Sequence, residues 1–318
     1  MSVLVYAESV NGAFKKAAFE ATSYGKKVAE QLNTNLVVLT INAIDSSELQ
    51  AYGAAEIITV SNGELGNDAK GIAGAVSAAA KAQNAEVVVI DSSANGLSIA
   101  PMVAVQLDAG LASNVVEAPS STAPFTVKRK AFSSKAFNHT TINSAIKVIG
   151  LAKNSFGVHE NAATANISSF DAPANNSSIS SVSVDQASGK VAIADAEIVV
   201  SAGRGLKGPE NWGMVEDLAD VLGAATACSK PVSDLGWRPH SEHVGQTGKP
   251  VSSNLYIAIG ISGAIQHLAG INASKVKVVI NTDAEAPFFK AADYGIVGDA
   301  FEVVPALIDK LKSFKAAQ

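Results

Sequence analysis

The first 91 residues alternate between short apolar runs and longer amphipathic stretches. The apolar runs are rich in β-branched residues, which is typical of buried strands, and the stretches between them have helical spacing. Strands alternating with helices predict an α/β domain with a mainly parallel sheet. The expected strands are Ser2–Ala7, Asn35–Asn42, Glu56–Val60 and Glu86–Asp91, and the expected helices are Phe14–Leu32 and Asn67–Ala82.

A second pattern of the same kind fills the C-terminal part of the chain. Between the two patterns, Ala123–Leu151 has the composition of further strands, and Asn154–Lys190 is crowded with Asn, Ser, Ala and Thr, as in a linker or surface crossing. We therefore predict two α/β domains with mainly parallel sheets, residues 1–190 and residues 191–318. The second domain has expected strands at Glu197–Ser201, Asn254–Gly260 and Lys275–Asn281, and expected helices at Asn211–Leu222, from Ser262 onward and at Val304–Phe314.

Composition supports two globular domains and excludes several functions. The 318 residues are 47% hydrophobic and 17% charged, and the net charge of −5 lacks the basic balance of a nucleic-acid-binding protein. The single cysteine, Cys228, excludes an internal disulfide and a thiolate metal cluster and fits a reducing compartment. No apolar run approaches the roughly 20 residues of a membrane span, and Met1–Glu8 lacks the features of a signal peptide. We expect a bacterial cytoplasmic protein without membrane insertion, with a processed mitochondrial matrix chain as the alternative.

Gly203–Gly208 matches the glycine pattern GxGxxG between an expected strand and an expected helix. In that context the pattern is typical of a dinucleotide-binding turn. The carboxylate that would bind the ribose of NAD about 20 residues later is missing, whereas Lys230 would suit a 2′-phosphate, so an NADP site stays open. Arg204 would hinder close packing on a pyrophosphate; we interpret it as a cation that faces a ligand, with a surface arginine as the alternative.

Gly260–His267 follows an expected strand and opens an expected helix with Ser262 as its N-cap. The free N–H groups of a helix N-terminus would attract a phosphate or an electron-rich ring edge. Gly263 and His267 are four residues apart and would share one helix face. We interpret His267 as a hydrogen-bond donor to a ligand that Gly263 allows to approach; a structural histidine is the alternative.

Val244–Lys249 resembles a P-loop only superficially, because its spacing is wrong and Pro250 follows the lysine. We expect a flexible polar loop whose Gln246 and Thr247 hydrogen-bond the edge of a heterocycle, with a solvated turn as the alternative.

Asn281 and Asp299 are expected at the carboxyl ends of strands, where ligands of open α/β sheets bind, although capping and turn formation are common roles of these residue types. His240 and His243 lack a third ligand for a metal and are expected on a loop surface. The sequence shows no metal site and no nucleophile with an evident base.

Together these motifs resemble the alpha subunit of electron-transfer flavoproteins. The resemblance implies a Rossmann-like C-terminal domain that binds one FAD, and a beta subunit that completes a heterodimer. The N-terminal half matches more loosely, chiefly at Asn95–Pro101. From about Val199 to Lys312 the match rests on Val199–Lys207, Val244–Lys249, Leu255–Gly270, Val279–Asn281, Glu285–Pro287, Ala292–Asp299 and Val303–Pro305.

The resemblance also implies which residues line the FAD. It places Thr247 at the N5/O4 edge of the flavin, His267 at the C2 carbonyl and Ser229 at the diphosphate, with Asn281 and Asp299 at the adenosine end. The full expected set is Arg204, Ser229, Lys230, Val244, Gly245, Gln246, Thr247, Ser262, Gly263, Ala264, Ile265, Gln266, His267, Asn281, Asp299 and Ala300.

One position departs from the family pattern. Where the family usually carries an arginine over the flavin, directly after the position of Ser229, this chain has Lys230. Lysine keeps the charge but lacks the planar guanidinium and its fork of donors. Because a cation near the N1–C2 edge stabilises the anionic reduced flavin, we expect a lower one-electron potential than in a relative with arginine.

The resemblance implies an electron carrier rather than an enzyme with its own substrate. It would take electrons from flavin dehydrogenases, such as acyl-CoA dehydrogenases of fatty-acid β-oxidation, and pass them to a quinone reductase of the respiratory chain. The N-terminal domain would grip the beta subunit while the FAD domain swivels on a linker at residues 183–196. Three alternatives stay open: a bifurcating flavoprotein subunit that takes electrons from NADH and has a second FAD on the beta subunit, an NADP-dependent oxidoreductase that uses residues 203–208, and a nucleotide-binding regulatory module without redox activity.

Overall fold

The computed structural model of the chain describes residues 1–65, 68–174, 182–184 and 192–317. Two compact units make up the chain: unit 1 contains residues 1–132 and 136–185, and unit 2 contains residues 133–135 and 186–318. The predicted boundary at residue 190 lies outside the described residues. In the described part of the chain, none of the helices has both the length and the apolar character needed to cross a membrane.

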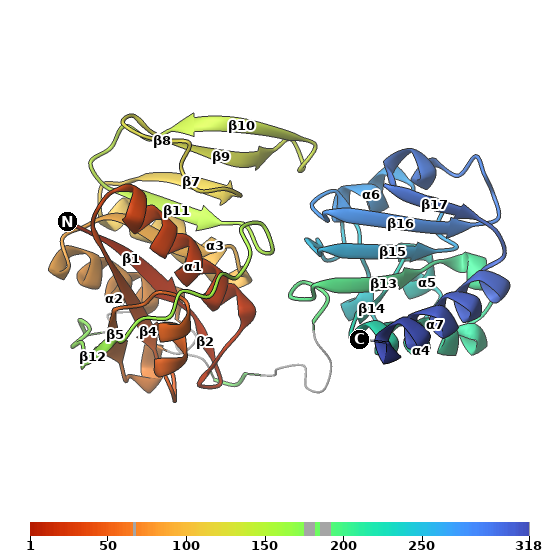
Figure 1. Ribbon diagram of the computed structural model, residues 1–318, viewed down its shortest axis with the longest axis horizontal. Coiled ribbons are helices and arrows are strands. Elements are labelled where there is room, and N and C mark those ends of the chain that lie inside the picture. The colour runs from red at the N-terminus through yellow and green to blue at the C-terminus, as the bar shows by residue number, and fades with distance from the viewer. Residues whose placement is uncertain (66–67, 175–181, 185–191, 318) are drawn as a thin grey trace. The chain divides into compact units, whose positions relative to one another are not determined.

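Unit 1 is built on a mainly parallel sheet. Within the residues described for this unit, ten strands pair in the order β10-β9-β7-β11-β6-β1-β4-β5-β12, with β8 alongside β9 (Figure 1). The strands from β7 to β12 in this order are parallel, whereas β8, β9 and β10 pair antiparallel. They are β1 (Ser2–Ala7), β4 (Asn35–Ile41), β5 (Glu56–Val60), β6 (Ala85–Asp91), β7 (Gly110–Val115), β8 (Ser121–Thr122), β9 (Phe125–Ala131), β10 (Ala136–Thr141), β11 (Lys147–Leu151) and β12 (Asn166–Ser169).

Helices cover both faces of this sheet. α1 (Lys16–Gln31) packs on one face, and α2 (Ala69–Ala82) and α3 (Ala94–Gln106) lie side by side on the other (Figure 1). Because the central strands are buried on both faces, their side chains are apolar without alternation. The remaining elements are the ribbon of β2 (Ser9–Val10) and β3 (Ala13–Phe14) and the 3₁₀ turns η1 (Ser47–Ala51) and η2 (Gly63–Leu65).

The predicted α/β class of unit 1 is confirmed, but α3 was not among the predicted helices. Pro101 lies inside it, and a proline removes one backbone donor and disfavours a helix interior. The helix forms nevertheless because Ile99 and Val103 are fully buried against β6, so that tertiary packing outweighs the local cost.

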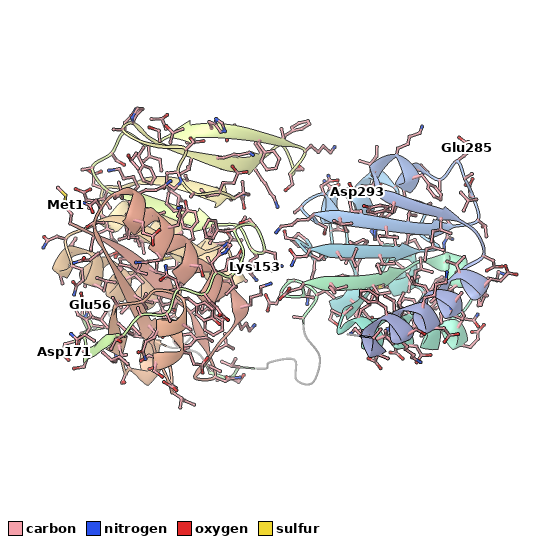
Figure 2. The ribbon with its side chains drawn as sticks, in the orientation of Figure 1. Met1, Glu56, Lys153, Asp171, Glu285 and Asp293 are labelled. Carbon is pink, nitrogen blue, oxygen red and sulfur yellow. The ribbon has the colours of Figure 1, made fainter. Side chains whose placement is uncertain are left out.

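The interpretation of Asn154–Lys190 as a linker is wrong for its first part. β12 pairs in parallel with β5 and so extends the sheet of unit 1. An open strand edge presents unpaired backbone groups, and a polar segment of extended chain satisfies them without adding to the core. Glu56 at the start of β5 and Asp171 just after β12 mark this edge (Figure 2).

Unit 2 is a smaller doubly wound domain. In residues 192–317, five parallel strands pair in the order β14-β13-β15-β16-β17. Their bounds are β13 (Ile198–Ala202), β14 (Ala225–Cys228), β15 (Leu255–Ile259), β16 (Val276–Asn281) and β17 (Tyr294–Val297). Counted in chain order this is 2-1-3-4-5, a doubly wound arrangement that shares with the Rossmann fold a reversal of direction at the first strand.

The helices of unit 2 also form two layers. α4 (Gly213–Leu222) and α7 (Ala300–Ala316) lie together on one face of the sheet, and α6 (Ile265–Ile271) packs on the other (Figure 1). The shorter elements are α5 (Lys230–Asp234), η3 (Arg204–Leu206), η4 (Pro209–Asn211), η5 (His240–Glu242) and η6 (Pro287–Ala291). The fold class predicted for this domain is confirmed, and β17 is the strand expected before Asp299, although β14 and α5 were missed.

Two boundaries in unit 2 differ from the prediction. Ile193 and Ala196 are buried in its core, so the end of the predicted 183–196 linker belongs to the domain. α7 begins at Ala300 rather than at Val304, because the Asp299 side chain caps it by accepting from the Phe301 N–H at 3.0 Å.

A buried carboxylate organises the loop that follows β11 in unit 1. Glu20 on α1 is 2% exposed and accepts three backbone N–H bonds, from Asn154 at 2.8 Å and from Phe156 and Gly157 at 2.9 Å each. Charge-assisted bonds of this kind are stronger than neutral ones, and each donor would otherwise lack a partner. Glu20 therefore joins α1 to the segment that leads toward β12.

Replacing Glu20 with Gln is expected to destabilise unit 1 by about 2 kcal/mol, because one carboxylate acceptor becomes an amide that faces backbone N–H groups. Both tryptophans, Trp212 and Trp237, lie in unit 2. Urea unfolding should therefore shift the far-UV circular dichroism transition and leave the tryptophan fluorescence transition in place. The control is Glu30→Gln on the same helix, where the exposed carboxylate is 3.6 Å from Lys26 Nζ and a change below about 0.5 kcal/mol is expected. Equal effects of both substitutions would contradict the assigned role of Glu20.

Candidate functional site

The carboxyl ends of β13 and β15 form the topological switch point of unit 2. From β13 the chain proceeds to β14 on one side, and from β15 it proceeds to β16 and β17 on the other. The loops that leave these two neighbouring strands therefore diverge, and ligands of open α/β sheets bind in the crevice between such loops.

The two loops touch through glycines. A Cβ on Gly205 would lie 2.6 Å from Gly260 Cα, and a Cβ on Gly203 would collide with the Gly260 carbonyl oxygen. Gly260 has φ of +61°, and a Cβ there would lie 2.8 Å from Gly205 Cα. The Gly205 N–H donates to the Gly260 carbonyl at 3.2 Å, which holds the loops together.

This contact explains the GxGxxG pattern without a dinucleotide fingerprint. Its first two glycines pack on Gly260, the 3₁₀ turn η3 lies within the pattern, and a second 3₁₀ turn, η4, separates the pattern from the start of α4 at Gly213. The fingerprint requires the glycine turn to lead directly into a helix whose N-terminus receives the pyrophosphate. The structural context on which the NADP alternative depends is therefore absent at residues 203–208.

A cavity of about 610 Å³ opens at this switch point, within the usual range of roughly 300–1,000 Å³ for ligand sites. It is formed by the carboxyl ends of β13, β14, β15 and β16 together with the loop before β15. Its lining residues are Gly203, Arg204, Gly205, Ser229, Lys230, Pro231, Asp234, His243, Val244, Gly245, Gln246, Thr247, Gly260, Ile261, Ser262, Ala264, Gln266, His267, Asn281 and Asp283.

Most residues of the predicted site meet in this cavity. Four do not line it: Gly263, Ile265, Asp299 and Ala300. Ile265 is exposed, and Asp299 caps α7 with its second carboxylate oxygen 3.9 Å from Lys207 Nζ. The cofactor contacts expected of the whole set stay predictions.

The predicted role of Ser262 as the N-cap of a helix is wrong. α6 begins only at Ile265, its N-cap is Ala264, and no side chain caps it. Gly263 precedes the helix, with φ of +86°, and a Cβ there would lie 2.5 Å from the Phe288 backbone nitrogen. Gly263 is thus required for the close approach of η6. The prediction that it shares a helix face with His267 is wrong, because it lies before the helix.

The loop from His243 to Lys249 is held by backbone hydrogen bonds rather than being the free polar loop that was expected. The Gln246 N–H donates to the Gln266 carbonyl at 2.7 Å, and the Lys249 N–H donates to the His243 carbonyl at 2.8 Å. A Cβ on Gly270 of α6 would lie 2.6 Å from Gly245 Cα, so helix and loop are in close contact. The side chains of Gln246 and Thr247 are exposed at the cavity, where they are available to a ligand.

Asn281 has the turn-forming role that was one of its two interpretations, and its contact with a ligand stays a prediction. Its side-chain N–H donates to the Ile261 carbonyl at 3.1 Å, and its side-chain oxygen accepts from the Asp283 N–H at 3.1 Å. It therefore ties the end of β16 to the loop after β15, while it also lines the cavity.

His267 is the most deeply placed polar side chain of the predicted set. It is 7% exposed, its Nε2 lies 3.0 Å from the Tyr256 hydroxyl, and its Nδ1 has no hydrogen-bond partner among the described residues. Burial, and secondarily the nearby His243, lowers the pKa of His267 to about 4; the Val244 backbone acts in the opposite sense without reaching hydrogen-bond geometry with Nδ1. The imidazole is therefore neutral at physiological pH, with one orphaned nitrogen that a ligand would satisfy.

His243 was expected on a loop surface, but it is 5% exposed and lines the cavity. A Cβ on Gly248 would lie 3.0 Å from its Cγ, so the ring fills the space under the loop. Burial lowers its pKa, as do His240 and Lys230, while Asp234 opposes the shift. The signal in the sequence was the glycine five residues later, which permits a ring beneath the loop, whereas His240 is exposed as predicted.

Two cations lie at the mouth of the cavity, which the carboxylates of Asp234 and Asp283 also line. Arg204 on η3 and Lys230 at the start of α5 both line it, and both are exposed. Neither has an ion-pair partner in the part of the chain that the structure describes, so both are available to an anionic ligand. Cys228 lies behind them, where burial raises its thiol pKa to about 12. In the described residues, no group of histidine, cysteine and carboxylate side chains is arranged to hold a metal ion.

Comparisons with known proteins concern both units. Residues 3–175 match the family model of the electron transfer flavoprotein domain, and residues 192–272 match that of the electron transfer flavoprotein FAD-binding domain. Three similar proteins are named electron transfer flavoprotein subunit alpha. The one from Thermoanaerobacterium thermosaccharolyticum is 35% identical over 98% of this chain and 98% of its own length. The one from Pseudomonas aeruginosa is 34% identical over 96% of this chain and 99% of its own length, and the one from Bacillus subtilis is 33% identical over 98% of this chain and 97% of its own length.

The neutral state of His267 makes unit 2 sensitive to acid. Its pKa is about 4 in the folded chain against an ordinary value of 6.5, so between these values the unfolded chain binds a proton that the native chain does not. The contribution of His267 to the free energy of unfolding is expected to be constant above pH 6.5. Below that pH it should lower the free energy of unfolding, by about 3 kcal/mol at pH 4. Urea unfolding followed by tryptophan fluorescence should show this loss, and His267→Asn should remove most of it. The control, His139→Asn at an exposed histidine of unit 1, should keep it; the same pH dependence in both variants would contradict the assignment.

Proposed function

Because this chain belongs to the electron transfer flavoprotein alpha-subunit family, we propose that it is an electron carrier whose FAD occupies the cavity of unit 2. The observation that supports this proposal is the convergence on one switch-point cavity of Arg204, Lys230 and His267, whose buried Nδ1 has no partner among the described residues. FAD is an anionic dinucleotide with a hydrogen-bonding ring edge, and this set of groups offers it two cations and a buried polar atom.

Bound FAD supplies the redox chemistry, and the chain supplies position and electrostatics. Arg204 and Lys230 provide positive charge where a reduced ring would carry negative charge. The exposed Thr247 would meet the N5/O4 edge of the flavin, and Ser229, buried directly after β14, would meet the diphosphate. His267 is neutral and adds a polar contact for the C2 carbonyl without adding charge to the cavity.

The partners follow from the family. We propose that unit 1 binds a beta subunit to complete a heterodimer, and that flavin dehydrogenases and a quinone reductase are transient redox partners. The bacterial relatives support a cytoplasmic site of action. Of the predicted hinge at residues 183–196, residues 185–191 lie outside the described residues. Since Ile193 is already part of the core of unit 2, the proposed hinge must end before it.

The visible spectrum of the purified heterodimer tests the proposal. Flavin absorption bands and one FAD bound to this chain are expected. An NADP-dependent oxidoreductase would instead bind NADPH without a yellow cofactor, and a regulatory module would bind AMP or ATP without redox activity. A colourless preparation that does not take up added FAD would contradict the proposal, whereas two FAD per heterodimer and reduction by NADH would indicate the bifurcating alternative.

Lys230→Arg is expected to raise the one-electron potential of the bound FAD. Arginine restores a planar cation with several donors at the cavity, and it stabilises the anionic reduced ring more than lysine does. Spectroelectrochemistry of the heterodimer measures the shift. Lys310→Arg on α7, which makes the same chemical change on a helix outside the cavity, is the control and should leave the potential unchanged. An unchanged or lowered potential in Lys230→Arg would refute the role assigned to this position.

A further inference from the structure

Three rings meet behind the cavity wall in unit 2. Tyr256 on β15 and Phe288 on η6 are both fully buried and lie 8° from parallel, with 6.5 Å between their centroids. The His267 ring is 6.1 Å from each of them. The three centroids therefore form a nearly equilateral triangle, and the imidazole packs against both buried rings, which restricts its orientation.

The hydrogen bond between Tyr256 and His267 joins two neutral groups. Burial raises the pKa of the tyrosine hydroxyl and lowers that of the imidazole, so neither is ionised at physiological pH. A neutral imidazole has one N–H donor and one acceptor nitrogen, and which nitrogen carries the proton depends on the partners. The 3.0 Å contact between the Tyr256 hydroxyl and Nε2 admits two arrangements: either the hydroxyl donates to Nε2, or Nε2 donates to the hydroxyl oxygen.

The surroundings distinguish the two arrangements. If Nε2 donated, the tyrosine proton would need a second acceptor, and the buried Nδ1 would be left as an unpaired acceptor. The nearby Ser201 hydroxyl forms no hydrogen bond, so among the described residues Nε2 is the one hydrogen-bond partner of the Tyr256 hydroxyl. If Tyr256 donates to Nε2, its proton has an acceptor and Nδ1 becomes an N–H donor.

We propose that Tyr256 is a positioning residue that holds His267 in the Nδ1–H tautomer and thereby gives the cavity a neutral hydrogen-bond donor. Tyr256 itself does not line the cavity and acts only through His267. The inference about the tautomer concerns the chain alone, and the use of the donor by a flavin rests on the proposed function. A neutral donor is suited to a carbonyl oxygen, because it binds without the cost of burying an imidazolium.

The test is a long-range ¹H–¹⁵N correlation spectrum of the full chain labelled at histidine nitrogens. Among the five histidines, His267 is assigned from the signal that His267→Gln lacks. In the unsubstituted chain we expect the His267 proton on Nδ1, with and without FAD. In Tyr256→Phe we expect a shift of the population toward the Nε2–H form and about a tenfold rise in the dissociation constant of FAD, as for the loss of one oriented hydrogen bond.

Tyr24 offers a matched control. It is also a fully buried tyrosine, it lies on α1 of unit 1, and its hydroxyl has no hydrogen-bond partner within the described residues. Tyr24→Phe removes the same atom from an equally buried site, so it should leave the His267 signals and the FAD affinity unchanged. A loss of FAD affinity of the same size in both variants would overturn the proposal.

Other outcomes separate this inference from the proposed function. An Nε2–H tautomer in the unsubstituted chain would overturn the inference directly, even if Tyr256→Phe did not fold. A tautomer that shifts in Tyr256→Phe while the FAD affinity stays unchanged would overturn the role of the donor in the cavity. An Nδ1–H tautomer that depends on Tyr256 in a chain that never binds FAD would support the inference and refute the proposed function.

Discussion

The contact of Gly203 and Gly205 with Gly260 is the constraint on which the rest of unit 2 depends. Two neighbouring parallel strands, β13 and β15, send their chains in opposite directions, and their loops must pass each other at van der Waals distance before they diverge. Any side chain at these positions would separate the loops and change the crevice that opens beyond them. The left-handed φ of Gly260 adds a second reason for glycine there. The strand order thus creates the cavity, and the three glycines allow the two loops to pass each other closely enough for it to form.

Unit 1 has a switch point of the same type, between β1 and β6, but its chemistry differs. Glu8 follows β1 and Asp91 ends β6, and burial together with the charge of Glu8 raises the pKa of Asp91. Two carboxylates at this edge oppose the charge of a diphosphate, whereas at the corresponding edge of unit 2 the carboxylates Asp234 and Asp283 are accompanied by the cations Arg204 and Lys230. The two cations are therefore the feature of the second sheet that supports the proposed placement of an anionic dinucleotide there.

Sequence patterns predicted most of the parallel strands because buried strands are β-branched and continuous. They missed β14, whose Ala225–Cys228 consists of small residues, and α3, whose Pro101 argues locally against a helix. The loops that line the cavity were predicted from motifs, because each motif is a continuous segment of the sequence. The place of His243 in the cavity was not predicted, because it depends on a ring packed under Gly248. The role of Tyr256 was not predicted, because its partner His267 lies eleven residues later on α6. Contacts between a strand and a helix or loop packed on it produce no regular spacing of residue types, so sequence patterns do not predict them.

The groups around the cavity divide into two kinds with different physical capacities. Arg204 and Lys230 are exposed at its mouth, where solvent screening and side-chain freedom make a cation effective for attraction and for tuning charge but poor at fixing geometry. His267 is buried, neutral and held by two rings and a hydroxyl, so it adds little charge but has a fixed direction. A carrier needs both, because the energy of the reduced ring and the position of its edge must be set independently. Under the proposed function, the potential would therefore change through a surface residue such as Lys230, while the position of the ring edge would depend on His267 and Tyr256.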